Sequence, residues 1–165
     1  MIRKIFHTYW SGLFVIILIT VFISQVNLPL INNVGLIPDY FLALSVALIA
    51  ERFKKLNILA IFLLGILVDF LVGELLGQYA LTFILMFMAN YVLHRFFKYE
   101  SSSQKLFLYI FLFELGFFTL ILTSLSFQLN TFSFDILIYK SLITVPFCFL
   151  YSFLFEQLTS FVDAK

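Results

Sequence analysis

The chain has 165 residues, of which 63% are hydrophobic, 20% aromatic and 12% charged. A soluble domain normally has about 25% charged residues, and one core of this size cannot bury so much apolar surface, so the composition predicts a protein embedded in lipid. The net charge of +1 argues against a nucleic-acid partner, because there is no basic face to contact phosphates. The single cysteine, Cys148, cannot form an intrachain disulfide.

Six apolar runs follow one another along the chain, and a bilayer-spanning helix needs about 20 such residues. The sequence therefore predicts an all-α, polytopic membrane protein, a single integral-membrane domain over residues 1–165 with six transmembrane helices. The expected helices are 9–26, 38–50, 57–73, 77–93, 106–127 and 136–155. The second is short. It spans only if the uncharged residues 32–37 lie at membrane depth or if the helix continues past Arg52.

Basic residues gather in alternate connections between these ranges. The connections 27–37, 74–76 and 128–135 contain no Lys or Arg. With six spans, nine of the ten basic residues fall on one side, which the positive-inside rule makes cytoplasmic, and both termini lie there too. Only Lys140 falls in the outer half. The nine are Arg3, Lys4, Arg52, Lys54, Lys55, Arg95, Lys98, Lys105 and Lys165.

The third range contains an ionisable carboxylate, Asp69, with glycines at intervals of four: Gly65 before it, and Gly73 and Gly77 after it. A charge within lipid is costly and usually marks a packed interior or a partner site. Glycines at this spacing allow another helix to come close. The pattern predicts a helix-packing and partner-recognition element.

Two alternatives stay open at Asp69. It forms an ion pair with Lys140 at an outer-facing pocket or partner contact, or it caps nearby backbone or stays protonated while Lys140 extends to the membrane interface. Glu114, in the fifth range, is either a proton- or cation-coupling carboxylate or a protonated acid hydrogen-bonded to a neighbouring helix. Three further polar residues are predicted to form hydrogen bonds between helices: Asn90, Thr119 and Thr123.

Catalytic and metal chemistry have little basis in this sequence. His7 and His94 are far apart and have no Cys, Asp or Glu at ligand spacing, so we expect no metal site and no cofactor. No Ser or Cys has a base nearby that would make it a nucleophile. The sequence predicts a protein that is not an enzyme.

The order of the polar elements resembles one family. Pro38-Asp39 opens the second helix, where a proline at the first turn is tolerated and an acid is favoured by the helix dipole. A basic turn follows, and then Leu64-Gly65-x3-Asp69-x3-Gly73-x3-Gly77 with Ala80-Leu81. This order resembles MreD, the small rod shape-determining membrane proteins of bacteria. The match by motif covers residues 36–92, whereas the first, fifth and sixth helices match only in hydropathy and placement.

The resemblance places the family motif on six positions. One departure is Lys55-Leu56-Asn57, where family members often have a glycine before the third helix, and it leaves the packing there open. The six positions are Pro38, Asp39, Gly65, Asp69, Gly73 and Gly77.

The resemblance implies a non-enzymatic scaffold of the elongation machinery in the bacterial inner (cytoplasmic) membrane. Such proteins bind MreC and work with MreB, RodA and a class B penicillin-binding protein in lateral peptidoglycan synthesis. The family fold is similar to that of the substrate-binding membrane subunits of energy-coupling-factor vitamin transporters, so the alternative is a subunit that binds a small molecule for transport. Those subunits dock their energising partner through small residues on the first helix, whereas residues 12–20 here are mostly bulky.

Overall fold

The computed structural model describes residues 2–25, 38–52, 57–72, 75–97, 102–126 and 134–163. Within these ranges it contains six α-helices and no β-strand, which confirms the predicted all-α fold. Each helix overlaps one predicted range, although the first begins before residue 9 and the last continues beyond residue 155. The helices are α1 (Ile2–Gln25), α2 (Tyr40–Arg52), α3 (Ile58–Val72), α4 (Gln78–Phe96), α5 (Ser102–Ser126) and α6 (Phe134–Asp163).

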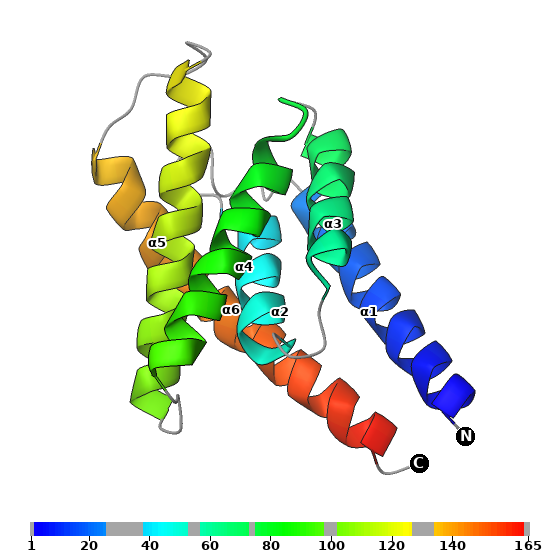
Figure 1. The fold of residues 1–165 in the computed structure, drawn as a ribbon. Helices are drawn as coiled ribbons and strands as arrows, with labels where there is room; N and C mark the ends of the chain where they lie inside the picture. The colour runs from blue at the N-terminus through cyan, green and yellow to red at the C-terminus, as the bar shows by residue number, and fades with distance from the viewer. Residues whose placement is uncertain are drawn as a thin grey trace.

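Successive helices run in opposite directions (Figure 1). The first turns of α1, α3 and α5 lie toward the same end of the molecule as the last turns of α2, α4 and α6. Short connections between helices favour this up-and-down order, because they return the chain beside the helix it has just left. The bundle therefore has two ends, and each helix begins at one and finishes at the other.

α2 lies at the centre of the bundle. It packs against α6, α5, α4 and α1, and every residue from 40 to 49 is buried. Leu42, Ala43 and Leu44 are at most 2% exposed although consecutive residues point to different sides of a helix. A helix that is apolar on all sides is expected in such an interior position.

α3 and α4 form an antiparallel pair, and α3 packs principally against α4 (Figure 1). α1 lies at the edge of the bundle, against α6 and α2. The hydroxyl groups of Thr20 in α1 and Tyr151 in α6 are 2.9 Å apart and form one of its polar attachments. The bundle thus has a tightly packed centre and a more lightly attached first helix.

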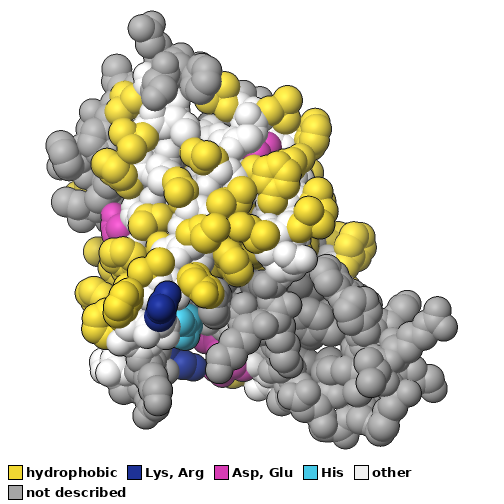
Figure 2. Space-filling model, viewed as in Figure 1, with side chains coloured by type: hydrophobic (Ala, Val, Ile, Leu, Met, Phe, Trp, Pro, Cys, Tyr) yellow, Lys and Arg dark blue, Asp and Glu magenta, His cyan; other side chains and the backbone are white. Residues whose placement is uncertain are grey.

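Much of the described surface of the bundle is apolar. Figure 2 shows apolar side chains across the upper and central part of the molecule, and the Lys and Arg side chains that are coloured there lie toward its lower end. Phe22 of α1 and Phe70 of α3 are 70% and 71% exposed. Soluble monomers rarely expose contiguous apolar surface on this scale, so lipid or protein is expected to cover it.

Among the described residues, one helical segment, 103–125 of α5, is by itself both long and apolar enough to cross a bilayer. Three shorter apolar segments are Phe14–Ser24, Tyr40–Glu51 and Ile58–Val72. The six-span arrangement is therefore still a prediction, whereas the six helices are observed.

Candidate functional site

The carboxylate of Asp69 caps the start of α4. Its Oδ2 accepts hydrogen bonds from the backbone N–H groups of Gly77 (2.9 Å) and Ala80 (3.3 Å), and its Oδ1 accepts one from the N–H of Tyr79 (2.7 Å). The first N–H groups of a helix lack partners within the helix and attract negative charge. Gly77 occupies the N-cap position of α4 and has no side chain to bond them. A carboxylate from α3, only 2% exposed, takes over this role.

Gly65 makes the approach of the two helices close enough for that cap. It lies one turn before Asp69, and residues four apart share a helix face. A methyl carbon at Gly65 would lie 2.4 Å from Cα and 2.7 Å from N of Ala80. These are backbone atoms, which cannot move aside as the end of a side chain can. Any larger residue would therefore separate α3 from the first turn of α4.

Gly77 is needed for a different reason. Its φ is +93°, in the left-handed region, and no atom lies within 4 Å of where a Cβ would stand. The position has room for a side chain but has a backbone conformation that residues other than glycine rarely adopt. The N–H of Gln78 donates to the carbonyl of Leu75 at 3.3 Å, so the chain turns sharply here into α4.

Asp39 caps α2 and also reaches two other helices. Its Oδ1 accepts a hydrogen bond from Leu42 N–H at 2.9 Å, as an N-cap side chain does. Its Oδ2 accepts one from the hydroxyl of Tyr79 in α4 at 3.1 Å. Its own N–H donates to Thr144 Oγ1 of α6 at 3.2 Å. Pro38, directly before it, is buried.

Tyr79 connects the two acids, because its N–H bonds Asp69 and its hydroxyl bonds Asp39. One residue of α4 thus joins the starts of α2 and α4 to the face of α3. Gly73, the remaining motif position, lies outside the described residues. We name this site the acidic junction and define it by six residues: Asp39, Gly65, Asp69, Gly77, Tyr79 and Thr144.

Glu114 and Lys140 make their contacts outside the acidic junction. Lys140 Nζ is 5.4 Å from the centre of the Phe117 ring, a cation–π contact between α6 and α5. Glu114 of α5 hydrogen-bonds Ser141 of α6. Among the residues that the structure describes, no ion pair joins Lys140 to Asp69. The geometry therefore favours the alternative in which Asp69 caps backbone.

Polar side chains link other helices deep in the bundle. Asn90 Nδ2 of α4 donates to the carbonyl of Ile49 in α2 at 2.9 Å, and Thr119 Oγ1 of α5 donates to Thr82 Oγ1 of α4 at 3.1 Å, as predicted. Thr123 differs, because its hydroxyl bonds carbonyl groups of its own helix. A threonine hydroxyl reaches the carbonyls three and four residues earlier more easily than a neighbouring helix.

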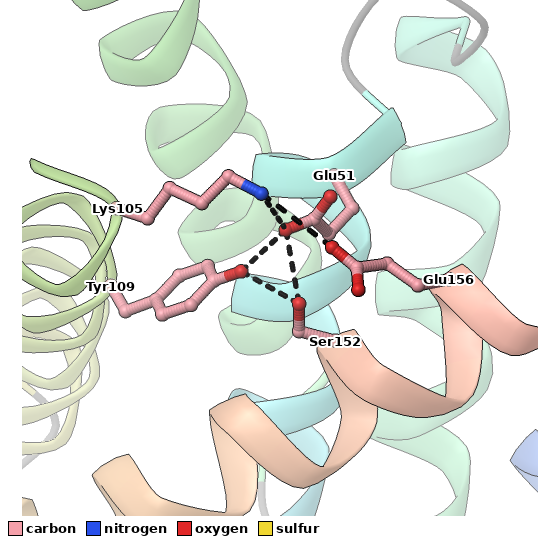
Figure 3. A network of polar contacts seen from close by, with 5 residues as sticks. All are labelled: Glu51, Lys105, Tyr109, Ser152 and Glu156. Carbon is pink, nitrogen blue, oxygen red and sulfur yellow. Dashed lines mark hydrogen bonds and ion pairs between the residues drawn. The ribbon is translucent and has the colours of Figure 1, made fainter. Parts of the chain in front are cut away.

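A second polar cluster, which the sequence did not reveal, lies at the end of the molecule opposite the acidic junction (Figure 3). Glu51 Oε1, from α2, accepts hydrogen bonds from Tyr109 OH (2.6 Å) and Ser152 Oγ (3.0 Å), and Tyr109 OH is 2.8 Å from Ser152 Oγ. Lys105 Nζ lies 3.7 Å from Glu51 Oε1 and 3.5 Å from Glu156 Oε1. The cluster joins α2, α5 and α6. We name these five residues the Glu51 cluster.

Neither site has the composition of a metal centre. Within the described ranges, no group of three or more His, Cys, Asp or Glu side chains is placed to hold a metal ion. In the acidic junction the carboxylate oxygens are already bonded to N–H and O–H donors. What this arrangement does chemically is to balance helix dipoles and fix four helices relative to one another.

The fold and the acidic junction define a class of protein: a small all-α bundle with an apolar exterior, in which buried acids hold helices together. A family model described as rod shape-determining protein MreD matches residues 4–158, nearly the whole chain, and the chain belongs to this family. MreD is a family of membrane proteins with a role in determining rod shape, and it is not known as a family of enzymes. No curated protein and no solved structure matches the chain significantly.

Proposed function

We propose that this chain is a non-enzymatic scaffold of the elongation machinery in the bacterial inner membrane. It binds MreC, and through the larger complex with MreB, RodA and a class B penicillin-binding protein it supports lateral peptidoglycan synthesis and rod shape. The first support is membership of the MreD family. The second is the packing role that the structure gives to the motif residues Gly65 and Asp69.

The observation that favours a scaffold most is the cap that Asp69 provides for α4. An acid that handled a substrate or a proton would need a free oxygen facing a path, whereas both oxygens of Asp69 accept backbone N–H groups. The adjoining Gly65 brings backbone against backbone. The motif residues thus hold a fixed surface, which is what a binding scaffold requires.

We further propose six membrane spans with both termini in the cytoplasm. The alternating helix directions in Figure 1 support this topology. α2 has 13 residues and α3 has 15, so at about 1.5 Å per residue they are about 20 Å long, less than the roughly 30 Å of a hydrocarbon core. Neighbouring helices surround α2, and non-helical backbone is tolerated at membrane depth where protein covers it.

The function is tested in a rod-shaped bacterium whose own MreD has been removed. The wild-type chain, expressed with the MreC of its own cell, is expected to restore rods and to co-purify with MreC. Asp69→Leu loses both, because α4 loses its cap. Leu67→Ala, an exposed position on the same helix, behaves as the wild type and serves as the control.

The result that overturns the proposal is a wild-type chain that reaches the membrane but neither retains MreC nor changes cell shape. The amount of Asp69→Leu protein in the membrane is measured in parallel, since a variant that fails to fold loses the complex for a trivial reason. Asp69→Asn, which keeps the size of the side chain and one oxygen, is expected to retain part of both functions.

The transport alternative predicts that the purified chain binds a small molecule saturably and tightly. The face of α1 that would dock an energising partner exposes Phe14, Leu18 and Phe22, which are bulky. Close docking of membrane helices normally uses small residues. We therefore rank the scaffold above the transport subunit, and a measured high-affinity ligand would reverse that order.

A further inference from the structure

The outward face of α5 contains a carboxyl group at the centre of its apolar surface. Exposed apolar residues follow one another on α5 at intervals of three and four, and Glu114 occupies one position in this series. We name the series the α5 stripe. Its members are Phe107, Phe111, Glu114, Phe118, Leu122 and Leu125.

Glu114 faces away from the core of its own bundle. The buried residues of α5, such as Leu112, Phe113 and Leu120, lie on the opposite side of the helix from the α5 stripe. Residues at 3-4 spacing share one face, and Glu114 falls within that face between Phe111 and Phe118. Its side chain is partly exposed, so the bond to a single hydroxyl of α6 does not cover it.

The depth of Glu114 makes this exposure costly. The segment 103–125 is long and apolar enough to cross a bilayer, and Glu114 is its central residue and its only acid. A carboxyl group at the middle of a membrane is disfavoured toward lipid whether it is ionised or protonated, because lipid tails offer no hydrogen bond. Such residues normally face protein or water.

The outward face of α3 provides the comparison. Its exposed residues include Leu59, Leu63, Leu67 and Phe70, and all of its exposed residues are apolar. That face suits lipid, whereas the α5 stripe has the same apolar character with one acceptor at its centre. A single polar residue in an apolar series of 3-4 spacing sets the register and the partner of a packed helix.

We propose that the α5 stripe binds one membrane helix of a partner protein, and that a hydrogen-bond donor on that helix meets Glu114 at the middle of the bilayer. The occupant is a helix because a polypeptide at that depth satisfies its backbone groups within itself. Polar side chains hydrogen-bond across membrane helices at such contacts. The choice of MreC as this partner rests on the proposed function.

A second copy of this chain fits the α5 stripe less well. Two copies inserted in the same direction are related by an axis along the membrane normal, so residues at one depth meet their equivalents. Glu114 would then meet Glu114, and two carboxyl groups at close range pair only if at least one of them is protonated, a requirement that a different donor on a partner helix does not impose. A partner helix with a Ser, Asn, Gln or basic side chain supplies a second donor, in addition to Ser141 of α6.

The test measures how much MreC co-purifies with the full chain from membranes at matched expression. We expect Glu114→Leu and Phe118→Ala to reduce the retained MreC by roughly threefold to tenfold, the size of one membrane hydrogen bond or packing contact. Glu114→Gln, whose amide oxygen still accepts a hydrogen bond, loses less than Glu114→Leu. Phe70→Ala removes an even more exposed ring from α3 and leaves the amount of MreC unchanged.

Two further measurements separate the interface from the fold. Ser141→Ala removes the bond between Glu114 and α6 and is expected to leave MreC binding unchanged. Thermal unfolding of Glu114→Leu in detergent occurs no lower than that of the wild type, because an outward carboxyl group is replaced by an apolar one. A fall in both binding and melting temperature would assign Glu114 to the fold and overturn the interface.

The outcomes distinguish this inference from the proposed function. MreC that stays bound to Glu114→Leu and Phe118→Ala overturns the α5 stripe and leaves the scaffold standing. A wild-type chain that binds no MreC overturns both. A dimer of the chain alone that disappears in Glu114→Leu assigns the α5 stripe to a second copy and overturns a partner protein as its occupant.

Discussion

At the scale of single residues, Asp69 is the side chain with the most consequential contacts. Three backbone N–H groups at the start of α4 converge on its two oxygens. These groups have no partner within α4, and that of Ala80 is buried, where an unpaired donor costs more than a typical hydrogen bond contributes. Asp69 thus stabilises the fold, although an acid in an apolar helix at first suggests a functional site.

Replacing Asp69 by asparagine tests this account. The amide keeps one acceptor but puts an N–H₂ group against the N–H groups of α4, so the free energy of unfolding is expected to fall by about 1–3 kcal/mol. Thermal unfolding of the purified chain in detergent measures it. The control is Phe153→Leu on α6, an exposed position outside the acidic junction. An unchanged melting temperature for Asp69→Asn would contradict the cap.

Two glycines allow a matched comparison of close packing. A Cβ at Gly65 meets backbone atoms of Ala80 at 2.4 Å, whereas a Cβ at Gly116 meets the flexible side chains of Met86 and Leu42 at 2.6 and 2.8 Å. Gly65→Ala is expected to lower the free energy of unfolding by at least about 1–3 kcal/mol through overpacking. Gly116→Ala costs less, because side chains move and alanine is the better helix former by about 1 kcal/mol. Equal melting temperatures would refute the backbone contact.

At the scale of elements, the chain builds its helix starts with help from other helices. α4 begins at a glycine in the left-handed region and receives its cap from α3, while the cap of α2 is itself bonded by α4 and α6. A helix that is capped by a side chain of another helix forms fully only when that helix is in place. The starts of α2 and α4 are therefore expected to order together with the packing of α3 and α6.

The turn before α4 gives a prediction about backbone conformation alone. Nothing lies near the position of a Cβ at Gly77, so Gly77→Ala introduces the strain of the left-handed region, about 1–2 kcal/mol, and no clash. Gly77→Asn is expected to cost less, since asparagine visits this region more readily. The melting temperature is expected to be highest with glycine at position 77, lower with asparagine and lowest with alanine. A larger loss for asparagine than for alanine would mean that space matters there after all.

The Glu51 cluster holds α2, α5 and α6 together at the end of the bundle opposite the acidic junction. Tyr109→Phe removes the hydroxyl that bonds both Glu51 and Ser152 and leaves the ring in place. The free energy of unfolding is expected to fall by about 1–3 kcal/mol, as for bonds to a charged group. Tyr139→Phe on α6, an exposed ring outside the Glu51 cluster, gives the comparison. A similar small change in both variants would show that the Glu51 cluster does not contribute to the free energy of unfolding.

The sequence predicted residue types and spacing better than it predicted partners. Gly65 and Asp69 stand out because glycine and an acid are rare in apolar helices, and the structure gives both a packing role. The partner of Asp69 stayed open because it is backbone N–H, which every residue other than proline has. Tyr79 has no local pattern that separates it from the other seven tyrosines.

The Glu51 cluster could not be predicted from the sequence for a related reason. Glu51 lies 58 residues from Tyr109 and 101 from Ser152 in the chain, and only the packing of α2 between α5 and α6 brings them together. The prediction that Thr123 bonds another helix was wrong, because the sequence does not show which face of α5 is covered. Local chemistry is thus visible in one sequence, whereas contacts between distant helices depend on the fold.

At the scale of the whole molecule, the two polar sites lie at opposite ends of a bundle whose described surface is largely apolar. The acidic junction lies at the end with the turn at residues 75–77, and the Glu51 cluster lies near the ends of α2 and α4. Arg95 and Lys105 lie at that second end as well. This distribution of charge accords with the proposed insertion, in which the basic end faces the cytoplasm.

The orientation is tested by placing single cysteines at the two ends. The background is Cys148→Ala, which removes the one native thiol. Leu76→Cys then reports on the turn before α4, and Phe97→Cys reports on the position directly after α4. Both positions are exposed, at 74% and 59%, so access depends on the side of the membrane and not on burial. A membrane-impermeant maleimide added to intact spheroplasts is expected to label the first and to label the second only after permeabilisation. Because α4 separates the two positions, labelling of both from outside would show that α4 does not span, and the reverse pattern would place the basic end outside and overturn the proposed topology.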